Sequence, residues 1–286
     1  MRAEDVRSVG VVGCGLMGSG IVEVCARAGC DVIYVEPTEE LVAAGRARIE
    51  RSVGRAVERG KLEAADAEYA FGRIAGATDL GALGGSDLLI EAVAEDLETK
   101  LDVFRKLDGL TRPEVVLASN TSSIPIVELA LATGRPDKVV GTHFFNPPPV
   151  MKLLELIPAL TTSEETLAFA RAFGKRLGKT TVVAKDHAGF IVNRLLVPYL
   201  NDVARLYDEG FATREDIDAA ISLGLGHPMG PLALMDLVGI DTCVHVADVL
   251  YAEFGDERYK APPVLRRMVA ARRLGRKSGR GFYEYD

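Results

Sequence analysis

The stretch "VGVVGCGLMGSGI" (residues 9–21) places a run of glycines between an apolar segment and a helix-like segment near the start of the chain. Residues 9–12 have the apolar pattern of a short buried strand, and the residues after the glycines have the pattern of a helix. Gly13, Gly15 and Gly18 therefore lie on a strand-to-helix turn with the spacing G-x-G-x-x-G. In such a turn the first glycine permits the tight bend, the second lets a pyrophosphate approach the backbone, and the third lets the helix pack against the strand.

The next apolar segment, "CDVIYVE" (residues 30–36), predicts a second strand that ends in Glu36. A carboxylate about 20 residues beyond such a turn hydrogen-bonds the hydroxyls of a ribose, and its charge repels a 2′-phosphate. We therefore predict an NAD site and expect NADP to bind less well. The alternative is a glycine-rich turn that binds no ligand. The predicted cofactor site comprises Gly13, Gly15, Leu16, Met17, Gly18 and Glu36.

The composition of the 286 residues is that of an ordinary globular protein, with 48% hydrophobic and 26% charged residues. The net charge of −7 gives no electrostatic reason to expect nucleic acid or an anionic membrane as a partner. The polar start, "MRAEDVRS", does not resemble a signal peptide, and no apolar run approaches the roughly 20 residues that span a bilayer. The four cysteines lack the spacing of a metal site or a disulfide framework, so we expect a cytoplasmic protein with reduced cysteines and no bound metal.

Segments with strand and helix patterns alternate almost throughout residues 1–187, which is typical of an α/β fold with a doubly wound, mostly parallel sheet. The pattern then becomes helical and contains no convincing strand. We therefore predict two domains, a dinucleotide-binding domain over residues 1–187 and an all-α domain over residues 188–286. Ser163 and Thr213 are expected to cap helices, one in each domain. The many apolar positions of the second domain favour a homodimer formed through it.

A long amphipathic helix is predicted over residues 39–59, directly after the second strand. Arg48, Arg51, Arg55 and Arg59 recur at spacings of three and four residues, so they share one face of this helix. One interpretation is a solvated basic face. The other is a docking strip for the anionic end of a ligand, and these residues alone leave both interpretations open.

Two polar turns follow strands of the predicted sheet, "SNTSS" (residues 119–123) and "GTHFFNP" (residues 141–147). Open α/β sheets bind ligands at the carboxyl ends of their strands, where both turns are expected. His143 lies in the second turn, and Glu155 follows on the next strand. A histidine oriented by a carboxylate suits general acid–base catalysis, because the carboxylate fixes the tautomer and stabilises the imidazolium. The alternative is a histidine that only packs in the core.

Six segments together are far more specific than the glycine turn: "GCGLMGSGI", "LASNTSSI", "GTHFFNPPPVMKLLE", "GFIVNR", "HPMGPLAL" and "GRKSGRGFYEY". With them, essentially the whole chain resembles the L-3-hydroxyacyl-CoA dehydrogenase family, and within it the bacterial 3-hydroxybutyryl-CoA dehydrogenases. The resemblance implies a Rossmann domain followed by a helical dimerisation domain. It also implies NAD as the cofactor and an acyl-CoA as the substrate.

The resemblance implies a role for each residue that matches a family motif. His143 looks like the catalytic base and Glu155 like its partner. Ser122 matches the serine that contacts the substrate oxygen, and Asn193 of "GFIVNR" matches the asparagine that completes the site. The positions that match NAD contacts are Glu95, Lys100, Asn146 and Lys277. The positions that match the CoA phosphate site are Arg51 and Arg55, where the family often has lysines, and this match strengthens the docking interpretation of the basic helix.

Two positions depart from the family pattern. Ala188 stands where proline is usual, and Glu36 stands where aspartate is more usual. Neither change removes a proposed catalytic group, and the longer glutamate should still reach a ribose. His187 and His227 are rival bases, but the first lies at the domain junction without an obvious partner and the second lies in a loop before a proline.

The expected activity is the oxidation of an L-3-hydroxyacyl-CoA such as 3-hydroxybutyryl-CoA by NAD, or the reverse reduction of acetoacetyl-CoA. A second hypothesis is a related dehydrogenase of a sugar acid, such as L-gulonate 3-dehydrogenase, which would not need the basic helix face. A third is a dinucleotide-binding protein without activity. Such a protein would have no reason to combine the four site residues Ser122, His143, Glu155 and Asn193.

Overall fold

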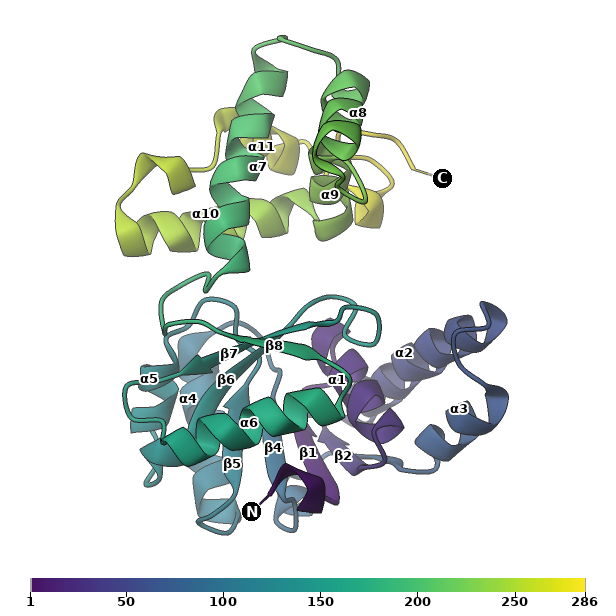
Figure 1. The fold of residues 1–286 in the computed structure, drawn as a ribbon, viewed down its shortest axis with the longest axis vertical. Coiled ribbons are helices and arrows are strands. Elements are labelled where there is room, and N and C mark those ends of the chain that lie inside the picture. Colours follow the sequence, from purple (N-terminus) through teal and green to yellow (C-terminus); the bar gives the residue numbers. More distant parts are fainter. Residues whose placement is uncertain (1, 286) are drawn as a thin grey trace. The chain divides into compact units, whose positions relative to one another are not determined.

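In the computed structural model, which describes residues 2–285, the strands of the first unit pair into one eight-stranded sheet (Figure 1). The order across the sheet is β3-β2-β1-β4-β5-β6-β7-β8, and neighbouring strands are parallel except for the antiparallel pair β6–β7. The strands are β1 (Ser8–Val12), β2 (Asp31–Val35), β3 (Ile74–Ala77), β4 (Leu88–Glu91), β5 (Val116–Ser119), β6 (Val139–Phe144), β7 (Leu153–Pro158) and β8 (Thr180–Val183). The predicted doubly wound, mostly parallel sheet is confirmed.

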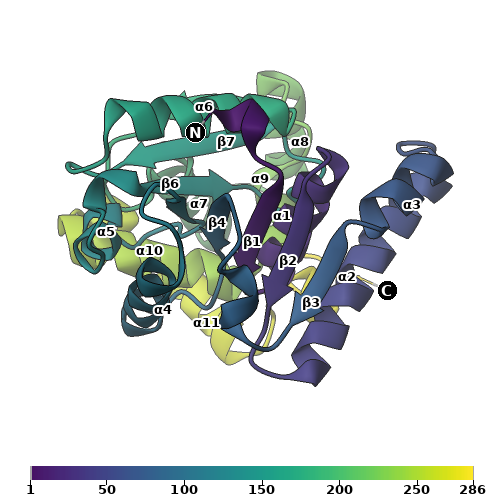
Figure 2. The same ribbon diagram turned by 90° about the horizontal axis from the view of Figure 1, so that it is seen from below.

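Helices cover both faces of this sheet. Helices α1, α2 and α6 contribute Ile21, Ile49 and Phe169 to a core shared with the strands, while α4 and α5 lie on the opposite face (Figure 2). The central strand β4 is buried along its whole length, as expected for a parallel strand covered on both sides. The helices of this unit are α1 (Leu16–Arg27), α2 (Glu39–Glu58), α3 (Ala64–Phe71), α4 (Leu97–Leu110), α5 (Ile126–Leu131) and α6 (Glu164–Arg176).

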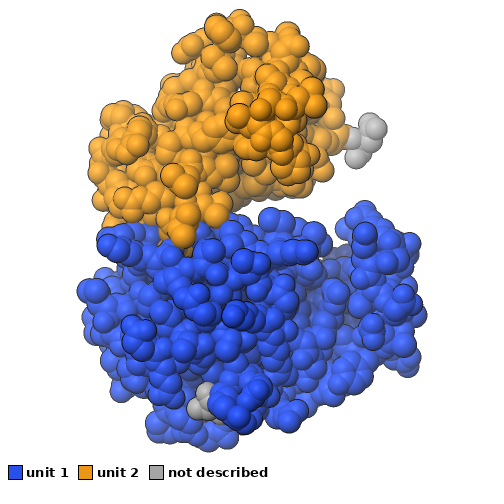
Figure 3. Space-filling model, viewed as in Figure 1, with its two compact units in different colours: residues 1–187 blue, residues 188–286 orange. Residues whose placement is uncertain are grey.

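The chain divides into two compact units, residues 1–187 and residues 188–286 (Figure 3). The second unit is helical and has a buried core of its own. Within its described residues, β-structure is limited to two isolated bridges. None of the helices in residues 2–285 combines the length and the apolar character needed to cross a membrane. The helices of the second unit are α7 (Val192–Asp208), α8 (Arg214–Leu225), α9 (Pro231–Val238), α10 (Ile240–Phe254) and α11 (Pro263–Ala270).

Polar side chains cap the N-termini of two helices at the positions that the sequence predicts. The Ser163 hydroxyl accepts a hydrogen bond from the backbone N–H of Thr166 in α6. The Thr213 hydroxyl does the same for Asp216 in α8. Each cap satisfies one backbone donor that the first helical turn would otherwise leave unpaired, so both predicted caps are confirmed.

The turn between β1 and α1 has the backbone that its glycines predict. Gly13 adopts a φ of +91°, which residues with a side chain rarely adopt. A Cβ on Gly18 would collide with the carbonyl oxygen of Gly13, so α1 can pack this closely only because the position is glycine. Apart from the adjoining residues of the chain, no heavy atom lies within 4 Å of the point where a Cβ on Gly15 would stand. The first turn of α1 has no side-chain cap, which leaves its N–H groups for an anionic ligand.

The residue patterns do not predict the helices α3 and α5 or the strand β3 of the first unit. β3 is a four-residue strand at the edge of the sheet, and half of its residues are exposed. It contains Gly76 and lacks an apolar run, so its local pattern is weak. Pairing with β2, in which Ile74 lies opposite Val32, determines its conformation. This is a case in which tertiary pairing outweighs local propensity.

Candidate active site

The carboxyl ends of β1, β2, β4, β5 and β6 lie along one edge of the sheet because these strands are parallel. The segments that follow them are the glycine turn, Glu36, residues 92–95, residues 120–123 and residues 145–150. Ligands of open α/β sheets bind at this edge. The catalytic and cofactor residues predicted in the first unit lie along it or in the first turns of the helices that follow.

His143 and Glu155 lie directly opposite each other in the antiparallel pair β6–β7. The Nδ1 atom of His143 lies 2.7 Å from the Oε2 atom of Glu155. The Glu155 side chain is fully buried, whereas 9% of the His143 side chain is exposed. The ring of Phe145 lies against the imidazole, with 4.7 Å between the ring centroids. A buried carboxylate at this distance holds the imidazole in one orientation.

The turn at residues 120–123 is held by the carboxylate of Glu95. Its Oε1 atom accepts hydrogen bonds from the hydroxyl of Thr121 at 2.5 Å, the backbone N–H of Ser122 at 2.9 Å and the hydroxyl of Ser123 at 3.0 Å. The Ser122 hydroxyl lies 3.4 Å from the same oxygen. Two residues that the sequence predicts for different tasks, Ser122 for the substrate and Glu95 for the cofactor, are therefore in direct contact.

Asn120 connects this turn to the strand that carries the histidine. Its side-chain oxygen accepts a hydrogen bond of 2.9 Å from the backbone N–H of Phe144, the residue that follows His143. Asn120 is not among the predicted site residues. The available signal was an asparagine in a turn at the end of a buried strand, where its side chain often pairs with backbone.

Lys100 is predicted to contact NAD, but only 1% of its side chain is exposed. Its Nζ atom lies 2.5 Å from Oε1 of Glu91 and 3.3 Å from Oε2 of Glu95. The lysine therefore lies beneath the edge of the sheet, between two carboxylates. No sequence pattern singles out Glu91, because it lies at the end of an apolar strand and shows its role only through this contact.

Glu36 lies at the glycine turn. Its Oε1 atom accepts a hydrogen bond from the backbone N–H of Cys14 at 2.5 Å. Arg48 also reaches this turn, with its Nη1 atom 3.4 Å from the carbonyl oxygen of Cys14. Burial, assisted by the charge of Glu36, raises the pKa of Cys14 to about 12, so the thiol is protonated at neutral pH and is not a nucleophile. One carboxylate and one guanidinium therefore set the charge of this turn.

A groove of about 680 Å³ lies along α1, α2 and residues 146–150. Arg51 and Arg55 are exposed where they line it. Neither forms an ion pair with any of residues 2–285, whereas the neighbouring Arg46 pairs with Glu50 at 3.1 Å. The groove is thus rich in uncompensated positive charge. Its predicted site residues and their basic neighbours are Arg48, Arg51, Arg55, Arg59, Lys61, Leu16 and Asn146.

Asn193 and Lys277 belong to the second unit. Asn193 is the second residue of α7, is half-buried, and lines a cavity of about 40 Å³ within that unit. Lys277 lies in a short 3₁₀ helix and forms an ion pair of 2.6 Å with Asp241. The predicted roles of both residues toward the ligands of the first unit stay predictions.

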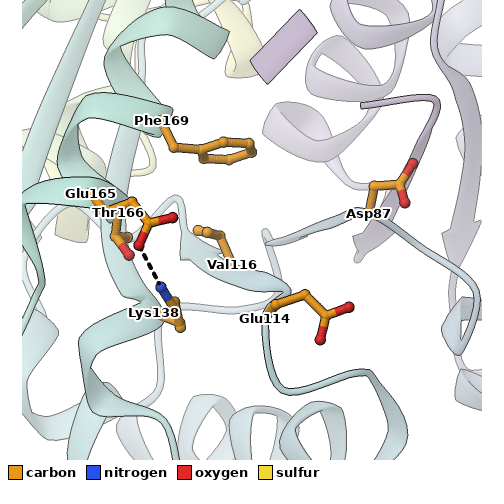
Figure 4. Close-up of a pocket in the computed structure, with 7 residues that line it drawn as sticks. All are labelled: Asp87, Glu114, Val116, Lys138, Glu165, Thr166 and Phe169. Atoms are coloured by element: carbon orange, nitrogen blue, oxygen red, sulfur yellow. Dashed lines mark hydrogen bonds and ion pairs between the residues drawn. The ribbon is translucent and has the colours of Figure 1, made fainter. Parts of the chain in front are cut away.

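Another cavity of the first unit lies at the opposite edge of the sheet. It measures only about 10 Å³, and Figure 4 shows it beside the ion pair of Lys138 and Glu165, whose atoms are 3.4 Å apart. It is bordered by the amino ends of β4, β5 and β6, where open α/β sheets do not bind their ligands. No group of three or more metal-ligating side chains occurs within residues 2–285. These observations leave the carboxyl edge as the candidate active site.

A Rossmann sheet that combines a dinucleotide turn with a buried histidine–carboxylate pair at one edge defines a class of proteins, the nicotinamide-dependent dehydrogenases. Two family models match the chain: "3-hydroxyacyl-CoA dehydrogenase, NAD binding domain" over residues 8–187 and "3-hydroxyacyl-CoA dehydrogenase, C-terminal domain" over residues 189–285. The chain belongs to the 3-hydroxyacyl-CoA dehydrogenase family. The family that the sequence motifs resemble is thereby confirmed, as is NAD as the cofactor.

The similarity to individual members extends over the full length. The chain is 51% identical to a 3-hydroxybutyryl-CoA dehydrogenase of Mycobacterium tuberculosis, over 99% of this chain and 100% of that one. It is 43% identical to the mitochondrial hydroxyacyl-coenzyme A dehydrogenase of Homo sapiens, over 98% of this chain and 91% of that one. The crystal structure of (S)-3-hydroxybutyryl-CoA dehydrogenase from Ralstonia eutropha is 44% identical, with a TM-score of 0.92 over 99% of this chain and all of that one.

Proposed function

We propose that the protein oxidises an L-3-hydroxyacyl-CoA, with 3-hydroxybutyryl-CoA as its substrate, and that it runs the reverse reduction of acetoacetyl-CoA. The observation that carries the proposal is the pair of His143 and Glu155, 2.7 Å apart at the edge that also holds the glycine turn. The full-length similarity to 3-hydroxybutyryl-CoA dehydrogenases supports the acyl-CoA substrate. The unpaired arginines of the groove support a site for the phosphates of CoA.

The proton of the substrate hydroxyl passes to Nε2 of His143, because Nδ1 faces Glu155. Neutral imidazole is the base, and it becomes an imidazolium as the bond between carbon 3 and its hydrogen breaks. Glu155 stabilises this positive charge through the hydrogen bond and does not itself take the proton. In the reverse direction the imidazolium donates the proton to the carbonyl oxygen of acetoacetyl-CoA.

The glycine turn fits the pyrophosphate of NAD, since α1 lacks a side-chain cap and space is open at Gly15. Bound NAD supplies the acceptor for the hydrogen that leaves carbon 3 with its electron pair. Ser122 and Asn193 donate hydrogen bonds to the reacting oxygen or to the thioester carbonyl, and so hold carbon 3 in position. The remaining cofactor contacts that we propose are Leu16, Met17, Glu95, Lys100, Asn146 and Lys277.

A steady-state assay tests this function. The protein is supplied with acetoacetyl-CoA and either NADH or NADPH, and in parallel with L-gulonate and NAD. We expect oxidation of NADH with acetoacetyl-CoA and no turnover of L-gulonate. Turnover of L-gulonate alone would assign the protein to sugar-acid oxidation. Absence of turnover with either substrate would indicate a dinucleotide-binding protein without this activity.

Glu36 is expected to favour NADH over NADPH, because a 2′-phosphate would bring like charges together. Replacing it with glutamine keeps an oxygen that can accept the hydrogen bond from Cys14 but removes the charge. Since juxtaposed like charges cost several kcal/mol, we expect Glu36→Gln to narrow the ratio of kcat/KM for NADH over NADPH by at least about tenfold. The ratio is measured by initial rates with each cofactor at saturating acetoacetyl-CoA.

The matched control is Glu36→Asp, which retains the charge and should retain the preference for NADH. If the parent protein uses NADPH as well as NADH, the carboxylate does not decide the choice. Arg48, which lies 3.4 Å from the carbonyl oxygen of Cys14, would then be the nearby cation that offsets it.

Arg51 and Arg55 are expected to bind the CoA end of the substrate. The two residues are one helical turn apart on α2 and line the groove. Because this contact is remote from carbon 3, its loss should raise KM and leave kcat nearly unchanged. For the double variant Arg51→Ala/Arg55→Ala we expect KM for acetoacetyl-CoA to rise about five- to tenfold at low ionic strength, less than for buried pairs because both arginines are exposed.

The matched control is Arg46→Ala on the same helix, since Arg46 pairs with Glu50 and does not line the groove. The effect should shrink with a short thioester of acetoacetate that lacks the nucleotide, and it should also shrink at high salt. An unchanged KM in the double variant at low ionic strength would identify the arginines as a solvated basic face.

We also propose a homodimer formed through the second unit. Its large exposed apolar side chains include Leu195, Phe211 and Leu223, each more than 70% exposed, and a second copy of the chain would cover such a surface. A cytoplasmic location is part of the same proposal. It is supported by the four cysteines, which are all free thiols, as expected in a reducing compartment.

A further inference from the structure

A buried ion pair lies directly beneath the proposed active site. Glu91 is the last residue of β4 and its side chain is fully buried; Lys100 lies in α4 and is 1% exposed. The Nζ atom of Lys100 is 2.5 Å from Oε1 of Glu91. Burying two charges costs so much desolvation free energy that a well-packed apolar pair in their place would often stabilise the fold equally. The contacts of this pair therefore suggest a purpose other than stability.

Glu91 connects three segments at the carboxyl edge. Its Oε1 atom accepts a hydrogen bond from the backbone N–H of Val93 at 2.7 Å, in the turn after β4. Its Oε2 atom accepts one from the hydroxyl of Ser119 at 2.6 Å, at the end of β5. Lys100 extends the network to Oε2 of Glu95 at 3.3 Å. The pair thus spans the starts of the two turns that follow β4 and β5.

The two oxygens of Glu95 have different tasks in this network. Oε2 faces Lys100, and Oε1 accepts the hydrogen bonds from residues 121–123. Burial favours the protonated form of this carboxyl group, but the charge of Lys100 and the hydrogen bonds from the turn outweigh it, so the pKa of Glu95 is lowered. An ionised Glu95 can accept all of these hydrogen bonds, whereas a protonated one would lose part of its acceptor capacity.

We propose that Glu91 and Lys100 are positioning residues, which hold Glu95 under the turn at residues 120–123 and thereby fix the Ser122 hydroxyl at the reacting oxygen of the substrate. Lys100 acts on Ser122 through the carboxylate of Glu95. The role of Ser122 in this inference rests on the proposed function. The mechanical part, that Lys100 orders the turn, does not depend on it.

The test compares Lys100→Met with Lys106→Met in the full-length protein. Lys106 lies on the same helix, is more than half exposed, and pairs only with the exposed Asp102 among the described residues. We expect backbone amide exchange within residues 120–123 to become at least about tenfold faster in Lys100→Met and to stay unchanged in Lys106→Met. This readout, measured by mass spectrometry, requires no catalytic activity.

The kinetic arm uses acetoacetyl-CoA and NADH. In Lys100→Met we expect kcat to fall about tenfold or more, because Ser122 no longer holds the reacting oxygen in position. In the background of Ser122→Ala, Lys100→Met should cause no further loss of kcat, since the two changes remove one shared contribution. A merely structural role of the lysine would lower kcat in both backgrounds.

Removing Lys100 leaves two carboxylates without their cation, so Glu91→Gln serves as a second variant. It keeps the shape of the side chain and an acceptor for Ser119 while it breaks the ion pair. Faster exchange at residues 120–123 in either variant supports the proposal. Unchanged exchange in both folded variants would overturn it, and so would an unchanged kcat in Lys100→Met. If the parent protein does not reduce acetoacetyl-CoA, the proposed function fails, and the exchange data still decide whether Lys100 orders the turn.

Discussion

His143→Ala is expected to lower kcat for acetoacetyl-CoA reduction by at least about 100-fold, the low end for loss of a general acid–base group. The imidazole is the proposed proton donor in this direction, and alanine leaves the carbonyl oxygen without one. The substitution leaves the glycine turn unchanged, so NADH should still bind. Steady-state assays with the purified protein measure kcat, and fluorescence titration measures the dissociation constant for NADH.

The two rival histidines supply the controls for this experiment. His187→Ala and His227→Ala make the same chemical change at residues without a carboxylate partner among the described residues, and both should retain turnover. Near-normal turnover of His143→Ala would exclude His143 as the base. Loss of turnover in one of the control variants would transfer the role to that histidine.

Glu155→Gln is expected to lower kcat for the oxidation of 3-hydroxybutyryl-CoA by about 100-fold to 10,000-fold, because it disturbs both the charge and the tautomer of the base. Glutamine has nearly the shape of glutamate, so the antiparallel pair β6–β7 should form as before. The amide can donate a hydrogen bond to Nδ1 of His143, which would then act as acceptor and leave the proton on Nε2. Neutral imidazole in that tautomer cannot take the substrate proton at Nε2, and the imidazolium has lost its stabilising charge.

A matched control is Glu165→Gln, since Glu165 is 72% exposed at the start of α6, beside the cavity at the amino edge. It should retain the kcat of the parent protein. A normal dissociation constant for NADH in Glu155→Gln would show that the first unit is folded. If that folded variant turned over at the rate of the parent, the carboxylate would have no part in the chemistry.

The antiparallel direction of β7 illustrates what the sequence contains and what it does not state directly. The residue patterns predict both strands around the proline-rich loop without assigning their direction. Residues 145–152 are too few for a parallel crossover, which takes a dozen or more residues, so a hairpin is the only arrangement that the chain length allows. With the hairpin formed, the register places His143 opposite Glu155, and the two residues that the motifs suggested come into contact.

The ion pair of Glu91 and Lys100 illustrates the opposite case. The glutamate ends an apolar strand and the lysine lies on the polar sequence of a helix, so each residue taken alone suggests an exposed charge. Their contact depends on how the turn at residues 92–96 folds back over the sheet, and this is a property of three-dimensional packing. Residue patterns predict elements and the edge at which ligands bind, but they do not predict which charges become buried together beneath that edge.

In the hairpin of β6 and β7, insertions are constrained differently in the strands and in the loop between them. Because side chains alternate between the faces of a strand, inserting one residue in β7 before Glu155 would turn the carboxylate to the other face and remove it from the imidazole. Residues 145–152 are under no such parity constraint, since the loop can change its length while the ladder keeps its register. Residues 146–150 of that loop form one wall of the arginine-lined groove. Descendants of this chain can therefore reshape the groove by lengthening or shortening one loop while the histidine and its carboxylate stay in register.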